Sequence, residues 1–302
     1  MLVRHRSARL VIDWHNLAFT ILRMNRRVPR AAVFAARWYE RTLARLAHAH
    51  LAVTGALSEF LQSDFGISRV TVLPDRPTAA FHRGLKLSSS AAACLPISPR
   101  DAPMIVSSTS WTPDEDFSVL LAALPILDTL VASSNDGPEK VLVLITGRGP
   151  LRAQFEEKVQ MLSLVHVVVH TAWLSYADYI AALSSAAVGI SMHVSSSGLD
   201  LPMKAVDMIG CGLPVLSPEF SAVRELIVDG RNGAVFDTAE ELAQLIAMLL
   251  RDWPNDPMLS VMRRETACWF GESHNPWKSV WTERAAPVFR SLAHRPEDVG
   301  RG

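Results

Sequence analysis

HVSSSGLDLPMKAVDMIGCGLPV, residues 193–215, is the stretch of sequence that decides the fold. It begins where the β-rich run AVGISMH ends, and its serines and first glycine predict a loop at the carboxyl end of a strand. Pro202 suits the first turn of a helix, and Gly212 followed by Pro214 predicts the start of the next strand. Strand, loop, helix and strand in this order are typical of a parallel βαβ unit.

The chain around this stretch alternates short β-rich runs with helical patterns, which predicts parallel βαβ layers. From Met104 onward we expect five strands, which read MIVSS, KVLVLIT, LVHVVVH, AVGISMH and LPVLS. Helices are expected at residues 117–131, 151–162, 176–184, 203–210, 239–250, 258–270 and 276–292. This pattern predicts a Rossmann-like domain, in which ligands bind beyond the carboxyl ends of the strands.

The first part of the chain predicts only part of a second sheet. Strands are expected at residues 10–14, 51–54 and 69–73, and helices at residues 31–48 and 56–65. Residues 74–103 are rich in Pro, Ser and Ala and have no clear period. We therefore predict an α/β fold of two Rossmann-like domains with an incomplete first one. The predicted limits are 1–95 for the first domain, 96–102 for a linker, 103–265 for the second domain and 266–302 for C-terminal helices.

Composition fits a folded protein and excludes several functions. Of the 302 residues 49% are hydrophobic, and 30 basic residues balance 30 acidic ones, so no global field attracts nucleic acid or anionic lipid. The three cysteines lack the spacing of a metal site or a disulfide framework. No run approaches the roughly 20 apolar residues that span a bilayer. We expect a soluble or peripheral protein of a reducing compartment.

Two loops carry candidate binding residues. Gly147-Arg148-Gly149-Pro150 follows a strand, and its glycines, its cation and the N–H groups of the next helix suit a diphosphate. The same sequence is also typical of an ordinary tight turn between strand and helix. In the second loop Ser195 to Gly198 can surround an anion, and Asp207 on the following helix can accept hydrogen bonds from ribose hydroxyls. The alternative is a flexible serine loop followed by an exposed helix carboxylate.

Three separated motifs carry a resemblance to a known family. They are VIDWHN at residues 11–16, SSTSWTPDEDF at 107–117 and SSSGLDLPMK at 195–204. With Asp207 three residues after the Lys, and Gly-x-Pro-Val five residues later, the chain resembles the chitobiosyldiphosphodolichol β-mannosyltransferases, which are glycosyltransferases of the GT-B type. The resemblance extends from about Val11 to the C-terminal helix with Trp277 and Trp281.

The resemblance implies inverting transfer of mannose from GDP-mannose to chitobiose linked to dolichol diphosphate, an early step of N-glycan assembly. It places the protein at the cytosolic face of the endoplasmic reticulum membrane, with possible association with other glycosyltransferases there. It implies no cofactor and no metal. The donor-binding residues would be Ser108, Thr109, Glu115, Gly147, Arg148, Gly149, Ser195, Ser196, Ser197, Gly198, Asp200, Lys204 and Asp207.

Catalytic groups are less defined by the sequence. His15 follows a strand, and a neutral imidazole near pH 7 can accept the proton of the attacking hydroxyl. Alternatively it closes the strand with hydrogen bonds. Asp114, Glu115 and Asp116 are candidate contacts of sugar or ribose, but three acids before a helix also complement the helix dipole.

The family's membrane-anchoring helix and the first units of its acceptor domain have no counterpart at the start of this sequence. We therefore expect an incomplete acceptor domain with an exposed apolar edge and face. Two other functions stay open: a truncated, non-catalytic paralogue that binds a GDP-sugar or a partner glycosyltransferase, and a transferase of this fold that uses a UDP-sugar. In the last helix, which this fold type returns to the first domain, we expect Trp277 and Trp281 to pack in the core.

Overall fold

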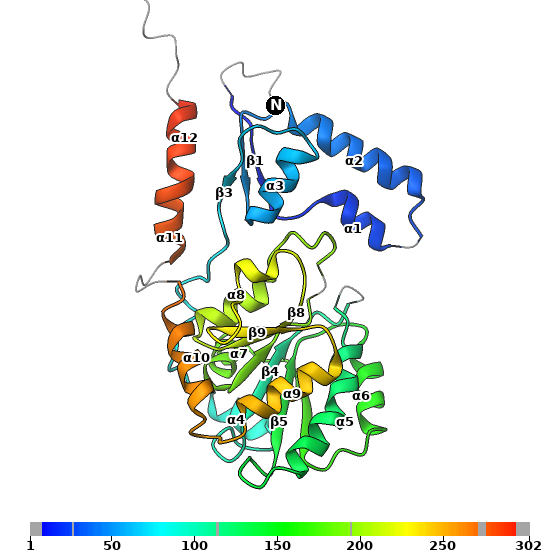
Figure 1. Cartoon of the computed structure of the whole chain (residues 1–302), viewed down its shortest axis with the longest axis vertical. Coiled ribbons are helices and arrows are strands. Elements are labelled where there is room, and N and C mark those ends of the chain that lie inside the picture. Colours follow the sequence, from blue (N-terminus) through cyan, green and yellow to red (C-terminus); the bar gives the residue numbers. More distant parts are fainter. Residues whose placement is uncertain (1–7, 26, 113–114, 194, 271–275, 294–302) are drawn as a thin grey trace, which may run out of the picture. The chain divides into compact units, whose positions relative to one another are not determined.

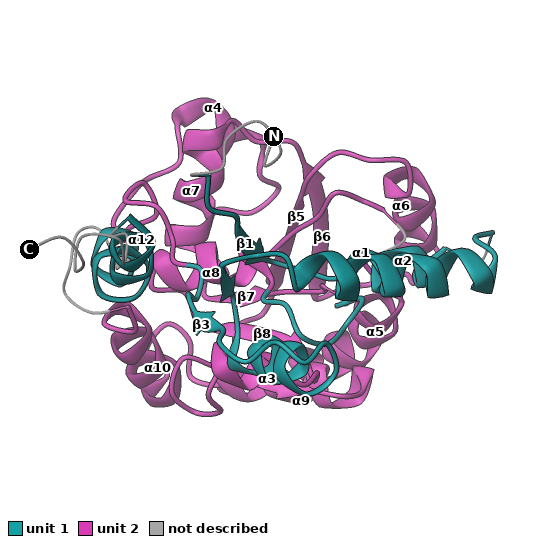
Figure 2. Cartoon of the chain, turned by 90° about the horizontal axis from the view of Figure 1, so that it is seen from above, with its two compact units in different colours: residues 1–75, 195–201, 275–302 teal, residues 76–194, 202–274 magenta. Residues whose placement is uncertain are grey.

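The computed structural model describes residues 8–25, 27–112, 115–193, 195–270 and 276–293. The chain divides into two compact units, which Figure 2 colours separately. The first unit comprises residues 1–75, 195–201 and 275–302, and the second comprises residues 76–194 and 202–274. These limits differ from the predicted ones, because the expected linker at 96–102 lies inside the second unit and the serine loop belongs to the first.

The second unit is built on one parallel sheet with the strand order β6-β5-β4-β7-β8-β9. Five of its strands are the predicted ones, and β9 was not expected from the sequence. The strands are β4 (Met104–Ser108), β5 (Val141–Thr146), β6 (Val167–Ala172), β7 (Val188–Ile190), β8 (Val215–Pro218) and β9 (Gly233–Phe236). The central strands β4 and β5 are buried along their whole length, as expected of a sheet with helices on both faces.

Helices precede, connect and follow the strands of this sheet (Figure 1). They are α4 (Ser89–Cys94), α5 (Ser118–Ala132), α6 (Arg152–Gln160), α7 (Tyr176–Ser185), α8 (Met203–Gly210), α9 (Ala239–Leu249) and α10 (Pro257–Ala267), and a 3-10 turn covers Val223–Glu225. Local chemistry sets several of their starts. Thr238 and Glu241 form a capping box at α9, Ser175 caps α7, and Asp256 caps α10 before Pro257. Leu120 and Leu124 of α5 join Ile246 of α9 in the main core.

The first unit holds a parallel sheet of three described strands, β1 (Val11–Trp14), β2 (Ala49–Ala52) and β3 (Thr71–Val72), in that order. Its helices are α1 (Ala18–Met24), α2 (Arg30–Ala44) and α3 (Gly55–Ser63). The sequence did not predict α1. Leu17, Leu57, Leu61 and Phe65 are fully buried between the sheet and these helices.

The C-terminal segment belongs to the first unit and is helical throughout its described part. It runs through α11 (Pro276–Val280), a π-helical turn (Trp281–Ala285) and α12 (Ala286–Ala293). Ala285 packs with Leu51 and Leu73, and Arg284 donates a hydrogen bond to the carbonyl of Val72 at 3.3 Å. This docking fits the returning helix that the fold type implies.

The expectation that Trp277 and Trp281 pack in the core is wrong. They are 36% and 37% exposed, and their ring centroids lie 6.1 Å apart on the helix surface. Trp281 also stacks on Phe289 at 5.4 Å. The small Ala285, which allows close approach of the helix to the sheet, makes the core contact instead.

Within the described residues, no helix has both the length and the apolar character needed to cross a bilayer.

Candidate functional site

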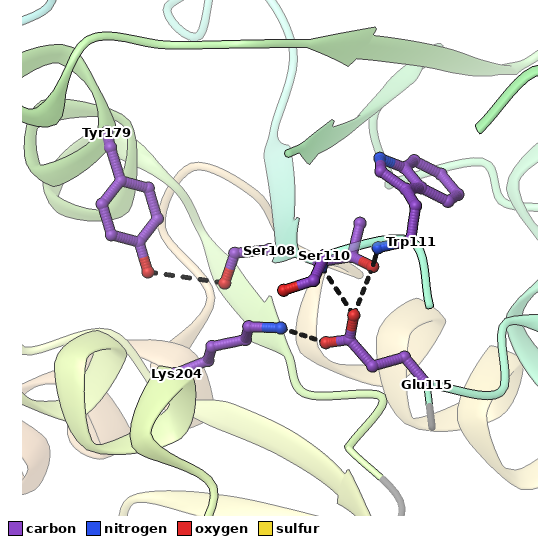
Figure 3. Close-up of polar contacts among 7 residues, drawn as sticks. Ser108, Ser110, Trp111, Glu115, Tyr179 and Lys204 are labelled. Atoms are coloured by element: carbon purple, nitrogen blue, oxygen red, sulfur yellow. Dashed lines mark hydrogen bonds and ion pairs between the residues drawn. The ribbon is translucent and has the colours of Figure 1, made fainter. Parts of the chain in front are cut away.

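A buried carboxylate organises the loop that follows β4 in the second unit. The Glu115 side chain is 3% exposed and accepts hydrogen bonds from Thr109 Oγ1 and from the backbone N–H of Ser110, each at 2.6 Å. Thr109 Oγ1 in turn accepts from the Trp111 N–H at 2.8 Å. Trp111 has a φ of 52°, in the left-handed region that few non-glycine residues adopt. The loop is therefore held in one shape by its own side chains (Figure 3).

Lys204 supplies the charge that balances this carboxylate. It lies in the first turn of α8, and its ammonium group pairs with Glu115 Oε1 (Figure 3). The Lys204 side chain is 32% exposed, so part of it faces solvent. β4 and β7 are neighbours in the sheet, which brings the loop after β4 and the helix after β7 together. Because the Glu115 carboxylate is itself held by hydrogen bonds, the ion pair fixes the position of the Lys204 ammonium group.

The two glycines after β5 serve close packing of one loop on another. A Cβ on Gly147 would lie 1.7 Å from the Thr109 carbonyl oxygen, and a Cβ on Gly149 would lie 1.9 Å from that of Ser110. The loop after β5 therefore lies directly on the backbone of the loop after β4. The sequence predicted that a ligand would approach the backbone beside these glycines. In the structure, the backbone of Thr109 and Ser110 lies there.

Arg148 lies between these glycines and is exposed. Its guanidinium carbon lies 4.4 Å from the centroid of the Trp173 ring, within the range of a cation–π contact. The contact leaves the N–H groups of Arg148 without a hydrogen-bond acceptor in the described part of the chain. A cation placed in this way can bind an anionic group of a ligand.

Asp207 lies on α8, one turn after Lys204, and is partly buried. Its carboxylate makes no hydrogen bond or ion pair with any described residue, and burial raises its pKa from 3.8 to about 7. Nearby, Tyr179 of α7 donates to Ser108 Oγ at 3.4 Å, and burial together with the charge of Asp207 raises the pKa of its phenol. An unpaired carboxylate in this setting gains from donors that a ligand would bring.

The serine loop lies in the first unit, where it folds on itself. Ser195 Oγ donates to Asp200, and the Gly198 N–H donates to Ser195 Oγ at 2.7 Å. Gly198 has a φ of 73°, a conformation that glycine adopts without strain. These hydrogen bonds favour a defined loop conformation, and the alternative of a flexible serine loop stays untested.

Residues at the ends of β1 and β2 hold this loop in place. Asn16 Nδ2 donates to Asp200 at 3.3 Å, and Ser196 Oγ donates to Asn16 Oδ1 at 3.3 Å. Thr54 Oγ1 donates to the carbonyl of Leu199 at 2.5 Å. Within the loop, the backbone N–H of Leu199 donates a hydrogen bond to Ser197 Oγ at 3.1 Å. The donor-binding role of this loop stays a prediction, because its polar groups are engaged within the first unit.

His15, the predicted base, lies between two carboxylates of the first unit. Its Nδ1 is 3.5 Å from Asp75 Oδ2 and its Nε2 is 3.3 Å from Asp13 Oδ2. The hydrogen bond and the charge of Asp75, helped by Asp13, raise the pKa of His15 to about 9. The imidazole is thus a cation at neutral pH. A protonated imidazole has no free electron pair with which to accept another proton. In the free protein His15 is therefore not the neutral base that the sequence predicted.

The acids before α5 have separate surroundings. Asp114 lies outside the described residues. Asp116 is exposed and accepts a hydrogen bond from the Ser118 N–H at 2.9 Å, which is the helix-start role that the sequence left open. Only Glu115 joins the polar cluster. Among the described residues no group of three or more His, Cys, Asp or Glu side chains is arranged to hold a metal ion.

The structure therefore brings together Thr109, Glu115 and Lys204 through hydrogen bonds and an ion pair. Asp207 lies on the same helix as Lys204, and Ser108, the residue before Thr109, accepts a hydrogen bond from Tyr179. Sequence reasoning missed Tyr179, Asp75 and Thr54. The last two follow β3 and β2, so the rule that ligand-binding residues follow strands could have found them. Tyr179 carried no such signal.

The comparison with known proteins agrees with this architecture. Residues 102–252 match the family described as Glycosyl transferases group 1. The chitobiosyldiphosphodolichol beta-mannosyltransferase of Homo sapiens is 37% identical over 93% of this chain and 67% of its own length. The chain belongs to this mannosyltransferase family. The resemblance stated from the three motifs is confirmed.

Other relatives extend the same result. The mannosyltransferase of this name from Arthroderma benhamiae is 38% identical over 91% of this chain and 64% of its own length. An Arabidopsis thaliana protein named UDP-glycosyltransferase TURAN is 33% identical over 97% of this chain and 73% of its own length. The chain thus spans about two thirds of the length of such relatives.

Solved structures share the fold. Sucrose-phosphate synthase from Thermosynechococcus elongatus has a TM-score of 0.67 at 14% identity and covers 94% of this chain and 67% of its own. Anabaena Alr3699/HepE in complex with UDP has a TM-score of 0.67 at 16% identity, with coverage of 94% and 72%. These matches, with the two parallel sheets, confirm the predicted α/β fold of the GT-B type.

Proposed function

We propose that this chain transfers mannose from GDP-mannose to chitobiose linked to dolichol diphosphate, with inversion at the anomeric carbon. The observation that carries the proposal is the 37% identity over 93% of the chain to a relative named for this acceptor and this sugar. The acceptor is membrane-bound, so the same proposal places the protein at the cytosolic face of the endoplasmic reticulum membrane, beside other glycosyltransferases.

The second unit offers groups suited to a nucleoside diphosphate. Lys204 and Arg148 supply two cations beyond the carboxyl ends of β7 and β5, the strands on either side of β4, where open α/β sheets bind ligands. Glu115 fixes Lys204, which removes much of the reorganisation that a mobile lysine would need before binding an anion. The unpaired carboxylate of Asp207 suits the two hydroxyls of a ribose.

Lys204 and Arg148 are proposed to contribute to the transfer through their positive charge. The acceptor hydroxyl forms a bond to the anomeric carbon as the bond to GDP breaks, and its proton passes to solvent or to the released phosphate. Negative charge develops on the departing diphosphate, and Lys204 and Arg148 are the cations proposed to stabilise it. No metal is required in this proposal, and transfer should persist in the presence of a chelator. In the free protein His15 carries a proton, so we assign it hydrogen-bond donation and positive charge instead of proton abstraction.

Calorimetry tests the donor. We expect GDP and GDP-mannose to bind the chain more tightly than UDP and UDP-N-acetylglucosamine. Asp207→Ala should weaken GDP binding by roughly 1.5–3 kcal/mol, the range for hydrogen bonds to a charged group. Glu157→Ala, which removes an exposed carboxylate of α6 in the same unit, is the matched control and should leave binding unchanged. Tighter binding of the uridine nucleotides would refute the proposed donor.

A second candidate function follows from the Arabidopsis relative, which is named as a UDP-glycosyltransferase. A transferase that uses a UDP-sugar would reverse the order of affinities in the same titration. A chain that binds GDP but gives no transfer would be the non-catalytic binding protein that the sequence left open.

A further inference from the structure

The helices α1 and α2 of the first unit expose an unusual amount of apolar surface. Within the described residues, 8 of the 19 exposed large hydrophobic side chains lie between residues 21 and 46. The largest are Phe34 at 71% exposure, Trp38 at 62%, Leu46 at 61% and Tyr39 at 59%. α1 and α2 lie side by side in the first unit (Figure 1). A cluster of this kind on a surface marks a contact with another molecule or with lipid.

Helical spacing divides α2 into two faces. Val33 and Ala36 are partly buried, and they pack with the buried Ala44 against the core of the first unit. Phe34 and Trp38, four residues apart, lie one above the other on the opposite side. We call this side the outer face of α2. It also carries two exposed arginines at the same helical spacing, which are Arg30 and Arg41.

The charge of this segment is strongly basic although the whole chain is neutral. Residues 17–48 contain seven arginines and one acid, Glu40, whereas the rest of the chain has 23 basic and 29 acidic residues. Glu40 is engaged internally, since its carboxylate accepts from the backbone N–H groups of Ala18 at 2.8 Å and Phe19 at 3.2 Å. The Glu40 carboxylate is therefore directed at the backbone of the unit and does little to offset the positive charge that the arginines present to a partner.

Most of these arginines are available for such a partner. Arg37 pairs with Asp64, and Arg45 donates to the Phe65 carbonyl. The guanidinium groups of Arg23, Arg27, Arg30 and Arg41 make no hydrogen bond or ion pair with any described residue, and all four side chains are exposed. Unpaired cations interleaved with exposed aromatic rings form a surface that is both apolar and positive.

We propose that the outer face of α2, with α1 beside it, docks in the plane of an anionic lipid bilayer. Aromatic rings take positions at the level of the headgroups, and arginines beside them bind lipid phosphates while their aliphatic stems cover apolar surface. α2 has 15 residues, too few to cross the bilayer but enough to lie along it. The excess of arginines over acids in residues 17–48 is complementary to the negative surface potential of an anionic bilayer, which favours lipid as the partner.

Vesicle sedimentation with the full chain tests this surface in the absence of nucleotide and acceptor, so its outcome is independent of the proposed transfer. We expect binding to phosphatidylcholine vesicles with about 30 mol% phosphatidylserine, and much weaker binding to phosphatidylcholine alone. Arg30→Glu with Arg41→Glu, and separately Phe34→Ala with Trp38→Ala, should each lower the partition coefficient by about tenfold or more. Binding of the unchanged protein should also fall as salt is raised, because the Debye length shortens.

Two matched double variants of the second unit serve as controls. Met161→Ala with Val165→Ala removes exposed apolar side chains, and Arg100→Glu with Arg251→Glu reverses exposed arginines. Both should bind vesicles like the unchanged protein, and circular dichroism establishes that all variants are folded. Equal binding by the α2 variants and the controls, or no binding to anionic vesicles, would overturn the proposal. So would self-association that depends on Phe34 and Trp38 without vesicle binding.

Discussion

Asp207 and His15 have pKa values that depart from their ordinary values in the same direction for opposite physical reasons. Burial without a partner raises the pKa of Asp207 to about 7, because it disfavours the charged form. Two neighbouring carboxylates raise the pKa of His15 to about 9, because they favour the charged form. Asp207 thus lacks donors that a ligand can provide, whereas His15 is already satisfied.

Asp207 makes the stability of the fold depend on pH. Between its unfolded pKa of 3.8 and its folded pKa of about 7, the folded chain holds a proton that the unfolded chain has released. Its contribution to stability therefore falls as pH rises through this window, and the cost of burying the carboxylate is fully present above pH 7. Relative to the unchanged protein, Asp207→Asn should gain stability by at most about 4 kcal/mol between about pH 4 and pH 8. Urea unfolding of the variant and of the unchanged protein at both pH values measures this gain in the free energy of unfolding. A difference in stability between the two proteins that is the same at both pH values would contradict the assigned burial of Asp207.

His15 can be titrated by NMR. We expect its ring protons to report a pKa near 9, and Asp75→Asn to lower that pKa toward 6.5, because Asp75 is the largest contributor. Asp13→Asn is the comparison variant and should lower the pKa less. A pKa near 6.5 in the unchanged protein would restore His15 as a neutral base at pH 7.

At the scale of elements, the loops after β4 and β5 pack directly against each other, backbone against backbone, so that neither can shift without the other. Gly149→Ala places a methyl group 1.9 Å from the Ser110 carbonyl oxygen, so one loop must move. We expect a loss of about 1–3 kcal/mol or more in the free energy of unfolding, as in other overpacked interiors. Gly230→Ala is the control, since its φ of 75° strains the backbone but nothing lies within 4 Å. It should cost about 1–2 kcal/mol from backbone strain alone. A smaller loss for Gly149→Ala than for Gly230→Ala would contradict the close packing.

The elements also show what the sequence can predict and what it cannot. Long apolar runs flanked by turn residues predicted β4 to β8 and the helices between them. β9 was missed because GAVF is four residues long and directly follows the turn residues DGRN, and α1 was missed because AFTILRM has only seven residues, too few to show a helical period. The pair of Glu115 and Lys204 was not predicted because its members are 89 residues apart. The strand order, which makes β4 and β7 neighbours, is the fact that joins them.

For the whole molecule, a net charge of zero conceals an uneven distribution of charge along the chain, with an excess of arginines in residues 17–48. The neutral total predicted no attraction to anionic lipid, but the adjacent helices α1 and α2 carry four arginines, Arg23, Arg30, Arg37 and Arg41, beside exposed aromatic rings. The exposed apolar surface of α1 and α2 is thus accompanied by positive charge, while the expected apolar edge and face of the first sheet stay a prediction. A membrane-bound acceptor and a membrane-binding surface would serve the same reaction, although each is tested separately.

The most direct test of the central claim is transfer itself. The full chain is incubated in a chelator with GDP-mannose labelled in the sugar and a lipid-linked chitobiose diphosphate, and the product is digested with a β-specific mannosidase. We predict a labelled lipid product that releases mannose on digestion, and its loss in Lys204→Ala, because the departing diphosphate then lacks its fixed cation. No product from GDP-mannose together with product from a UDP-sugar, or a product resistant to the β-specific enzyme, would contradict the account.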